Sequence, residues 1–410
     1  MTKKTQETFF ELLRAGLWGG KRSVSGSTFN FVDSCHNSAN RASTMALAAP
    51  RVQASGDVDW RLLKDVADKQ GLSAIVLDGL DKLNSNDTNL TNMPQMLRLE
   101  WIGEVLQGEA ANATQKKIAE EMAALFHENC IKTFVLKGYV ISECYPKPNH
   151  RFSVDMDCFL SNDNVNLNLN DDGNKWSSHN EAWKLGNELI KAKGYKVGEG
   201  FYKNSTFHLP GLMVENHQFM VPWRGNKKLK NLEILLQEMM IMANVSESVE
   251  DLRIGKSHLF RPPVMVSALF MIEHAYSHFL SEGLTWRMVL DWTLFSENHK
   301  EEILWKDFDK HIEKFGFKKF YDSYNRLGLY LIGEIQESNL RFQDRKMLED
   351  IWAPLDLHES LHGVKAKFQL AGNTWRARWK YRLFTDINWM QALWIQVKGF
   401  FFMRHPKLKV

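Results

Sequence analysis

The sequence predicts an α+β fold with a small mixed β-sheet between large helical N- and C-terminal regions. Apolar residues recur at helical spacing through most of residues 1–129 and again through 226–410. Between these flanks, residues 130–225 contain short β-branched and apolar runs that end at Gly, Pro or Asn-rich segments. We therefore expect three regions: a helical N-terminal region over 1–129, an α+β core over 130–225, and a helical C-terminal domain with a basic aromatic tail over 226–410.

The composition is that of a globular protein. Of 410 residues, 44% are hydrophobic and 25% are charged, and this length suits two or three domains. Lys and Arg number 52 against 49 Asp and Glu, so the net charge of +3 does not favour nucleic acid as a partner. The four Cys are widely spaced without a CxxC pattern, and residues 1–10 lack the apolar stretch of a secretory signal. We therefore expect a cytoplasmic protein.

The elements of the core follow from its periodicity. Residues 133–136 form an expected buried strand that ends at Lys137-Gly138, and the short helix after it stops at Pro146. The next expected elements are a strand over 152–160, a helix over 181–193, and short strands near 195–197, 206–209 and 212–220. Further helices are expected over 262–280, 286–295, 308–315 and 320–332.

Two acidic residues mark the second strand. Asp155 and Asp157 are two positions apart, which places both carboxylates on one face of a strand. Carboxylates held side by side repel each other unless cations lie between them. Mg²⁺ suits this role because it binds oxygen ligands and shares its coordination sphere with phosphates and water. Two Mg²⁺ ions about 3.5–4 Å apart would clamp the attacking and leaving oxygens of an in-line phosphoryl or nucleotidyl transfer.

A third carboxylate is expected on a later strand. In the segment LMVENHQFM, Met213, Glu215 and His217 share one face. Glu215 would bind a metal or accept the proton of an attacking hydroxyl. A surface Glu at a strand edge is the alternative, and the spacing alone does not decide between the two. His208 and His217 flank this acid; contact with the nucleotide or the leaving phosphate is the alternative to a structural role, which we favour for each.

The turn before the acidic strand is expected to bind phosphate. Gly138 lets backbone amides approach an anion at the start of the short helix, and Lys137 adds a positive charge for a triphosphate. Arg151 would bind phosphate in a fork geometry, or else pair with the acidic cluster. Ser153 shares the face of Asp155 and would position a phosphate or a metal-bound water.

The order of these elements resembles the nucleotidyltransferase superfamily that includes DNA polymerase β. The stretch LKGYVISECYP followed by RFSVDMD resembles more closely the bacterial uncharacterised nucleotidyltransferase family, as do FELLRAGL, HAYSH and the Trp-rich tail. The resemblance implies that Asp155 and Asp157 bind two Mg²⁺ ions, that Glu215 is the third acid, and that Lys137 and Gly138 form the phosphate loop. It also implies an NTP as substrate and a sugar or lipid-linked acceptor in surface-polysaccharide biosynthesis. This chain has Lys-Gly-Tyr where the superfamily usually has Gly-Ser.

The reaction expected from this pattern transfers an NMP group from an NTP to a hydroxyl or phosphate acceptor and releases pyrophosphate. Other functions stay open. The run RFSxDxD also resembles abortive-infection-type toxin nucleotidyltransferases that act on tRNA or protein. In those toxins the Lys-Gly turn continues with a second Gly and a Thr, which are replaced here by Tyr139 and Val140. A non-catalytic nucleotide-binding scaffold protein of polysaccharide assembly is a further alternative.

Two features outside the core have competing interpretations. His274 and His278 are spaced i, i+4 on an expected helix, and a packed pair is favoured over a zinc site because Ala275 replaces the Glu of a metalloprotease motif. The tail over 375–410 is basic and aromatic. Peripheral contact with an anionic membrane or with a nucleic-acid backbone is an alternative to packing within the helical domain, which we favour.

Overall fold

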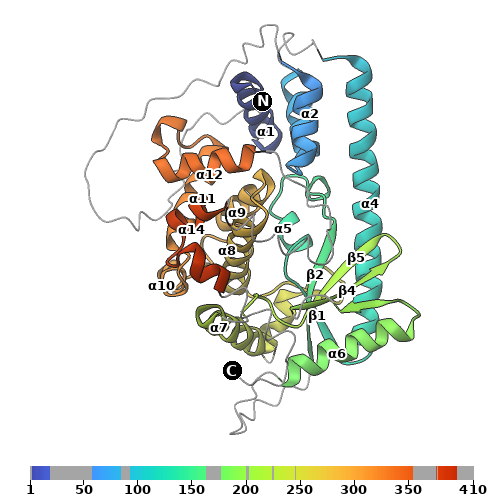
Figure 1. Cartoon of the computed structure of the whole chain (residues 1–410). Coiled ribbons are helices and arrows are strands. Elements are labelled where there is room, and N and C mark those ends of the chain that lie inside the picture. The colour runs from blue at the N-terminus through green and yellow to red at the C-terminus, as the bar shows by residue number, and fades with distance from the viewer. Residues whose placement is uncertain are drawn as a thin grey trace. The chain divides into compact units, whose positions relative to one another are not determined.

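The computed structural model describes residues 2–18, 58–84, 93–162, 177–199, 203–223, 226–244, 246–353, 375 and 377–394. Figure 1 traces the helices and strands along the chain. The chain divides into two compact units, Met1–Gln107 and Gly108–Val410, and helix α4 (Gln95–His127) contributes residues to both. The predicted α+β fold with helical flanks is confirmed.

The first unit is helical. Its elements are α1 (Lys3–Trp18), α2 (Trp60–Lys69), α3 (Ser73–Asn84) and the first turns of α4. Helices α1 and α3 approach closely because Gly16 and Gly79 lie where they cross. A Cβ atom on Gly79 would stand 1.8 Å from the carbonyl oxygen of Leu12, so a larger side chain would separate the helices.

The described residues of the second unit form one mixed six-stranded sheet, with the strand order β3-β4-β5-β2-β1-β6. Central strand β2 pairs antiparallel with β1 and parallel with β5, while β6 pairs parallel with β1. The strands span β1 (Ile131–Val135), β2 (Asp155–Asn162), β3 (Val197–Glu199), β4 (Asn204–Leu209), β5 (Leu212–His217) and β6 (Leu259–Phe260).

Each face of the sheet is covered by helices (Figure 1). Met156 and Cys158 of β2 point to the face that packs on α6 (Ser177–Ala192) and on the C-terminal half of α4, where Phe126 is fully buried. The opposite face meets α8 (Val264–Ser281), whose Phe270 ring lies 6.4 Å from the ring of His217 on β5. The alternation along β2 therefore directs Asp155 and Asp157 toward the helical C-terminal region.

Most helices of the second unit lie where the periodicity of the sequence predicted them. Helix α9 begins at Trp286, where the hydroxyl of Thr285 caps it by accepting a hydrogen bond from the N–H of Met288. The remaining elements are α5 (Tyr139–Ser142), η2 (Pro148–His150), α7 (Lys227–Asn244), η3 (Glu247–Leu252), α9 (Trp286–Asn298), α10 (Trp305–Phe315), α11 (Lys318–Ile332), η4 (Glu337–Asn339), α12 (Phe342–Trp352) and α14 (Arg378–Phe384).

Two of the differences from the sequence-based expectation concern β2 and β6. Strand β2 begins at Asp155, three residues later than expected, because Ser153 folds back and donates a hydrogen bond to the carbonyl oxygen of Asp155 at 2.8 Å. Strand β6 was not predicted. It lies directly before Arg261 and two prolines. With only two residues, it is too short to show the alternation of a strand in the sequence.

The described part of the aromatic tail packs against the helical region. The Phe384 ring lies 5.0 Å from that of Phe279 on α8, and Trp379 lies 6.0 Å from the same ring. Trp375 and Trp394 are more than half exposed, and residues 395–410 lie outside the described ranges. Membrane contact through this tail therefore stays a prediction. Among the described helices, none combines the length and the apolar character needed to cross a membrane.

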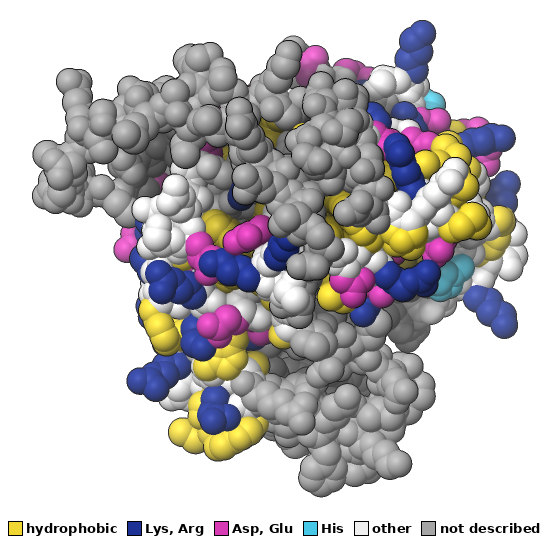
Figure 2. Space-filling view, turned by 90° about the horizontal axis from the view of Figure 1, so that it is seen from above, with side chains coloured by type: hydrophobic (Ala, Val, Ile, Leu, Met, Phe, Trp, Pro, Cys, Tyr) yellow, Lys and Arg dark blue, Asp and Glu magenta, His cyan; other side chains and the backbone are white. Residues whose placement is uncertain are grey.

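The surface carries charges of both signs. On the face shown in Figure 2, the described Lys and Arg side chains are interspersed with Asp and Glu. This distribution agrees with the balance of 52 basic and 49 acidic residues in the whole sequence.

We expect Glu233 on α7 to make the stability of the protein depend on pH. Its buried carboxylate accepts hydrogen bonds from the N–H of Val221 at 2.8 Å and from Gln237 at 2.6 Å. Burial outweighs these bonds and raises the pKa of Glu233 from 4.5 to about 7. The folded state therefore holds this proton more tightly, and its stabilisation is complete below pH 4.5 and is lost as the pH rises through 7. The loss amounts to roughly 3 kcal/mol.

The Glu233→Gln variant is expected to show a flatter dependence of unfolding free energy on pH, measured by urea denaturation between pH 5 and pH 8. Because other groups also titrate, the readout is the difference between the two proteins. Identical slopes for wild type and variant would show that Glu233 does not bind a proton in this range.

Candidate active site

The register of two strands brings the predicted acids together. Strands β2 and β5 are parallel, with Asp157 directly opposite Glu215 and Asp155 opposite Met213. Paired residues share a face, so the three carboxylates lie on the same side of the sheet. Asp157 is deeply buried, with 1% of its side chain exposed, whereas Asp155 and Glu215 retain about a quarter of theirs. The Glu215 carboxylate is also held from β4, where Asn204 donates a hydrogen bond to it at 2.6 Å.

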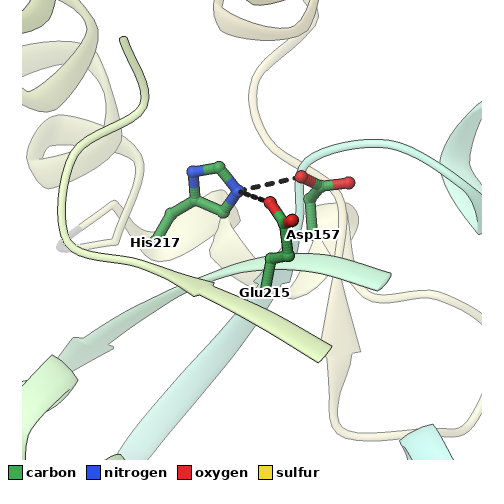
Figure 3. A group of neighbouring side chains, drawn as sticks. All are labelled: Asp157, Glu215 and His217. Atoms are coloured by element: carbon green, nitrogen blue, oxygen red, sulfur yellow. Dashed lines mark hydrogen bonds and ion pairs between the residues drawn. The ribbon is translucent and has the colours of Figure 1, made fainter. Parts of the chain in front are cut away.

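His217 joins this group, as Figure 3 shows. Its Nε2 lies 2.8 Å from Asp157 Oδ1 and 3.5 Å from Glu215 Oε2, and its Nδ1 lies 3.2 Å from the carbonyl oxygen of Phe219. Burial lowers the pKa of His217, but its hydrogen bonds to Asp157 and Glu215 outweigh this and raise that pKa. The sequence assigned His217 a structural role, yet its position two residues after Glu215 on the same face already indicated this contact.

Lys137 lies between the two predicted metal ligands. Its ammonium group is 3.0 Å from Asp157 Oδ2 and 3.9 Å from Asp155 Oδ2. Burial opposes the charge on Lys137, but the two carboxylates outweigh it and raise the lysine pKa. Burial also opposes the charge on Asp157, yet Lys137 and His217 hold the pKa of that carboxyl well below its usual range. The ammonium is thus the counter-ion of the acidic pair.

His274 completes the surroundings of Lys137. Its Nε2 lies 3.3 Å from the lysine Nζ, and its ring packs edge-on against that of His278, with 4.5 Å between centroids. Burial and the neighbouring ammonium hold the pKa of His274 well below its usual value. A neutral His274 can therefore accept a hydrogen bond from Lys137. This geometry fits the packed pair that we favoured for these two histidines.

Gly138 allows the turn that carries Lys137. Its φ of +80° lies in the region that other residues avoid, and a Cβ atom there would come within 3.6 Å of Ser153 Oγ. The N–H of Leu136 donates to the carbonyl oxygen of Asp157 at 2.9 Å, which extends the strand pairing up to the turn. Gly138 and Ser153 therefore line the same side of the site as Asp155.

Arg151 does not contact the acidic pair. Its Nε and Nη2 each donate to a carboxylate oxygen of Asp291 on α9 at 2.8 Å, and both side chains are buried. The Tyr145 hydroxyl donates to the same carboxylate at 2.7 Å. This bidentate pair ties the loop before β2 to α9, so the fork that was expected to hold phosphate is occupied by a protein carboxylate.

One comparison with known proteins identifies the chain's relatives. A family model described as an uncharacterised nucleotidyltransferase matches residues 56–328, more than half of the chain. The chain belongs to this nucleotidyltransferase family. The resemblance inferred from the sequence motifs is thereby confirmed. No curated protein and no solved structure matches the chain. Family membership implies a nucleotide substrate and, in general, a divalent metal.

The acidic cluster of this nucleotidyltransferase is chemically suited to a divalent cation. Asp157 Oδ2 is buried, and the ammonium of Lys137 lies 3.0 Å from it. Within the described ranges, one group of three metal-binding side chains has its donor atoms within 4.8 Å of one another: Asp157, Glu215 and His217. Asp155 lies outside that group, on the Lys137 side. The donors are mainly carboxylate oxygens, which Mg²⁺ prefers.

Two cavities meet at the site of this nucleotidyltransferase. A cavity of about 220 Å³ is bounded by α8 and α9, and one of about 430 Å³ by α4, α5 and the loop before β2. The side chains that line both cavities are Lys137, Arg151, Ser153 and Asp155. Asp155 and Lys137 are therefore accessible from both cavities.

Replacing Lys137 by Met tests whether its ammonium occupies the place of a metal. The change leaves the buried carboxylates with less positive charge, so we expect the metal-free protein to lose about 3–5 kcal/mol of stability. Millimolar Mg²⁺ should restore more stability in Lys137→Met than in wild type, because no ammonium has to move. Thermal denaturation with EDTA and with Mg²⁺ measures both effects. The exposed Lys306→Met is the control, and an equal response to Mg²⁺ in all three proteins would contradict the expectation.

Proposed function

We propose that the protein transfers an NMP group from an NTP to a hydroxyl or phosphate of a second substrate, with release of pyrophosphate, by a mechanism that needs two Mg²⁺ ions. The single observation that carries the proposal is the cluster of Asp155, Asp157 and Glu215 on one face of β2 and β5, of which Asp155 lines both cavities. Bound there, Mg²⁺ would stabilise the charge that develops on the attacking and leaving oxygens.

Each member of the cluster has a separate proposed role. Asp157 would be the ligand common to both ions, because its two oxygens face opposite partners: Oδ1 lies toward His217 and Oδ2 toward Lys137. Asp155 would bind on the Lys137 side. Glu215 would bind on the other side and take the proton of the acceptor hydroxyl. Its pKa is lowered by the hydrogen bond with His217, although burial opposes this, so it is ionised as a ligand must be.

The neighbouring residues would hold and orient the reactants. Lys137 would move from the carboxylates to the triphosphate once metal neutralises the acidic pair, since an ammonium and a divalent cation would otherwise repel each other there. Gly138 and Ser153 would shape the turn beside it, close to Asp155. Arg151 would act as a positioning residue, because its guanidinium is bound to Asp291.

The proposed acceptor is a sugar or a lipid-linked sugar of surface-polysaccharide biosynthesis. Its class comes from the family resemblance. A cavity of about 430 Å³ next to Asp155 supports a small second substrate, because it lies within the usual size range of small-molecule pockets. Balanced surface charge agrees with such a substrate better than with nucleic acid.

The test is pyrophosphate release from each of the four NTPs with Mg²⁺, in the absence and presence of monosaccharides, sugar phosphates and a polyprenyl-linked sugar. Mg²⁺-dependent release that requires one acceptor is the expected result. Release that requires tRNA or a protein substrate would favour the toxin-like alternative. NTP binding without release from any acceptor would favour a nucleotide-binding scaffold.

A further inference from the structure

One cation beside the active site forms no ion pair with a carboxylate of the described residues. Arg287 lies on α9 and lines the 220 Å³ cavity together with Asp155 and Lys137. Its Nη1 donates to the carbonyl oxygen of Phe152 at 3.0 Å. In the part of the chain that the structure describes, no carboxylate approaches its guanidinium within ion-pair distance. The remaining N–H groups are thus available to the cavity.

The other cations around this cavity are compensated or neutral. Lys137 faces two carboxylates, and His278 Nδ1 lies 3.1 Å from Glu282. Arg151 is bound to Asp291, four residues after Arg287 on the same helix. His274 is held neutral by its low pKa. The positive charge that remains in the cavity is therefore that of Arg287.

The surroundings also disfavour that charge in the absence of a ligand. Burial and the neighbouring Arg151 lower the pKa of Arg287, and Asp291 offsets this only in part. A guanidinium that is poorly compensated inside a concave site is stabilised when an anion enters. Its planar fork matches two phosphate oxygens. The anion that must lie beside Asp155 in the proposed reaction is the triphosphate.

We propose that Arg287 binds the β- and γ-phosphates of the NTP in the cavity between α8 and α9. The inference rests on the proposed function and assigns to Arg287 the role that the sequence suggested for Arg151. The hydrogen bond to Phe152 fixes one edge of the guanidinium and directs the rest into the cavity. Sequence reasoning did not single out Arg287, because the i, i+4 spacing of Arg287 and Asp291 predicts an ion pair between them, whereas Asp291 binds Arg151 in the structure.

Calorimetry on the full chain tests this role directly. The probes are ATP, GTP, CTP and UTP with Mg²⁺, and the NMP of whichever NTP binds tightest. For Arg287→Gln we expect about 10- to 100-fold weaker binding of that NTP, the usual effect of losing a charged hydrogen bond. Binding of the NMP should change less than threefold. Arg287→Lys should fall between wild type and Arg287→Gln, because it keeps the charge and loses the fork.

The control is Arg345→Gln, the same chemical change at an exposed position on α12. It should bind the NTP as wild type does. Thermal denaturation shows whether each variant is folded, and Arg287→Lys keeps the test open if Arg287→Gln does not fold. Equal weakening of NTP and NMP, or unchanged NTP binding by both Arg287 variants, would overturn the role of Arg287 while the proposed function stands. If wild type binds none of the four NTPs, both proposals fail together.

Discussion

Replacing Asp157 by Asn is expected to lower Mg²⁺-dependent pyrophosphate release by about 1,000-fold or more. Asp157 is the candidate ligand between the other acids. Its carboxylate has Asp155 and Lys137 on one side and Glu215 and His217 on the other. Loss of its charge weakens metal binding on both sides. A metal contributes several kcal/mol to charge stabilisation in such transition states, and each 1.4 kcal/mol corresponds to a factor of ten in rate.

The measurement separates binding from chemistry. The rate of pyrophosphate release and the Mg²⁺ concentration for half-maximal rate are recorded for wild type, Asp157→Asn and the exposed control Asp65→Asn. The site variant should need far more Mg²⁺ and stay slow at saturation, and the control should match wild type. If the Asp157→Asn variant retains more than a tenth of the wild-type rate at saturating Mg²⁺, Asp157 is not a ligand shared by both metal ions.

The sequence predicted the parts of this site that depend on local geometry. The i, i+2 spacing of Asp155 and Asp157 is sufficient to place both carboxylates on one face, whatever pairs with the strand. The positive φ of Gly138 is likewise a local requirement of the turn. Glu215 was a less certain candidate, because its place opposite Asp157 depends on the parallel pairing of β2 with β5. No local pattern specifies such a register.

The partners of the cations could not be predicted for the same reason. Arg151 is close in sequence to Asp155, but its carboxylate partner, Asp291, is 140 positions away on α9. Proximity in sequence therefore suggested phosphate or the acidic pair as its ligand, while tertiary packing selected a different carboxylate. Lys137 shows the opposite case: the residue was found by its motif, and the structure adds that its ammonium lies between the two acids.

Replacing Asp291 by Ala is expected to destabilise the protein by about 3–5 kcal/mol, the usual cost of leaving one member of a buried ion pair without its partner. The change leaves the guanidinium of Arg151 and the hydroxyl of Tyr145 buried without their acceptor. It also removes the ion pair that connects the loop before β2 with α9, so the affinity for NTP should decrease together with the stability of the protein. Urea denaturation gives the change in unfolding free energy.

A double replacement distinguishes the cost of an unpaired charge from the value of the pair itself. Arg151→Met with Asp291→Leu removes both charges, and hydrophobic residues that fill the space of a buried ion pair are often neutral for stability. We therefore expect the double variant to regain most of the loss, apart from about 1–2 kcal/mol for the unpaired hydroxyl of Tyr145. The exposed pair of Lys191 and Glu188 is the matched control, and Glu188→Ala should cost less than about 1 kcal/mol. If the double variant is as unstable as Asp291→Ala, the loss comes from packing rather than from the uncompensated charge of Arg151. The charge of Arg151 would then contribute little to stability, and Arg151 would position the loop before the acidic pair through the packing of its side chain.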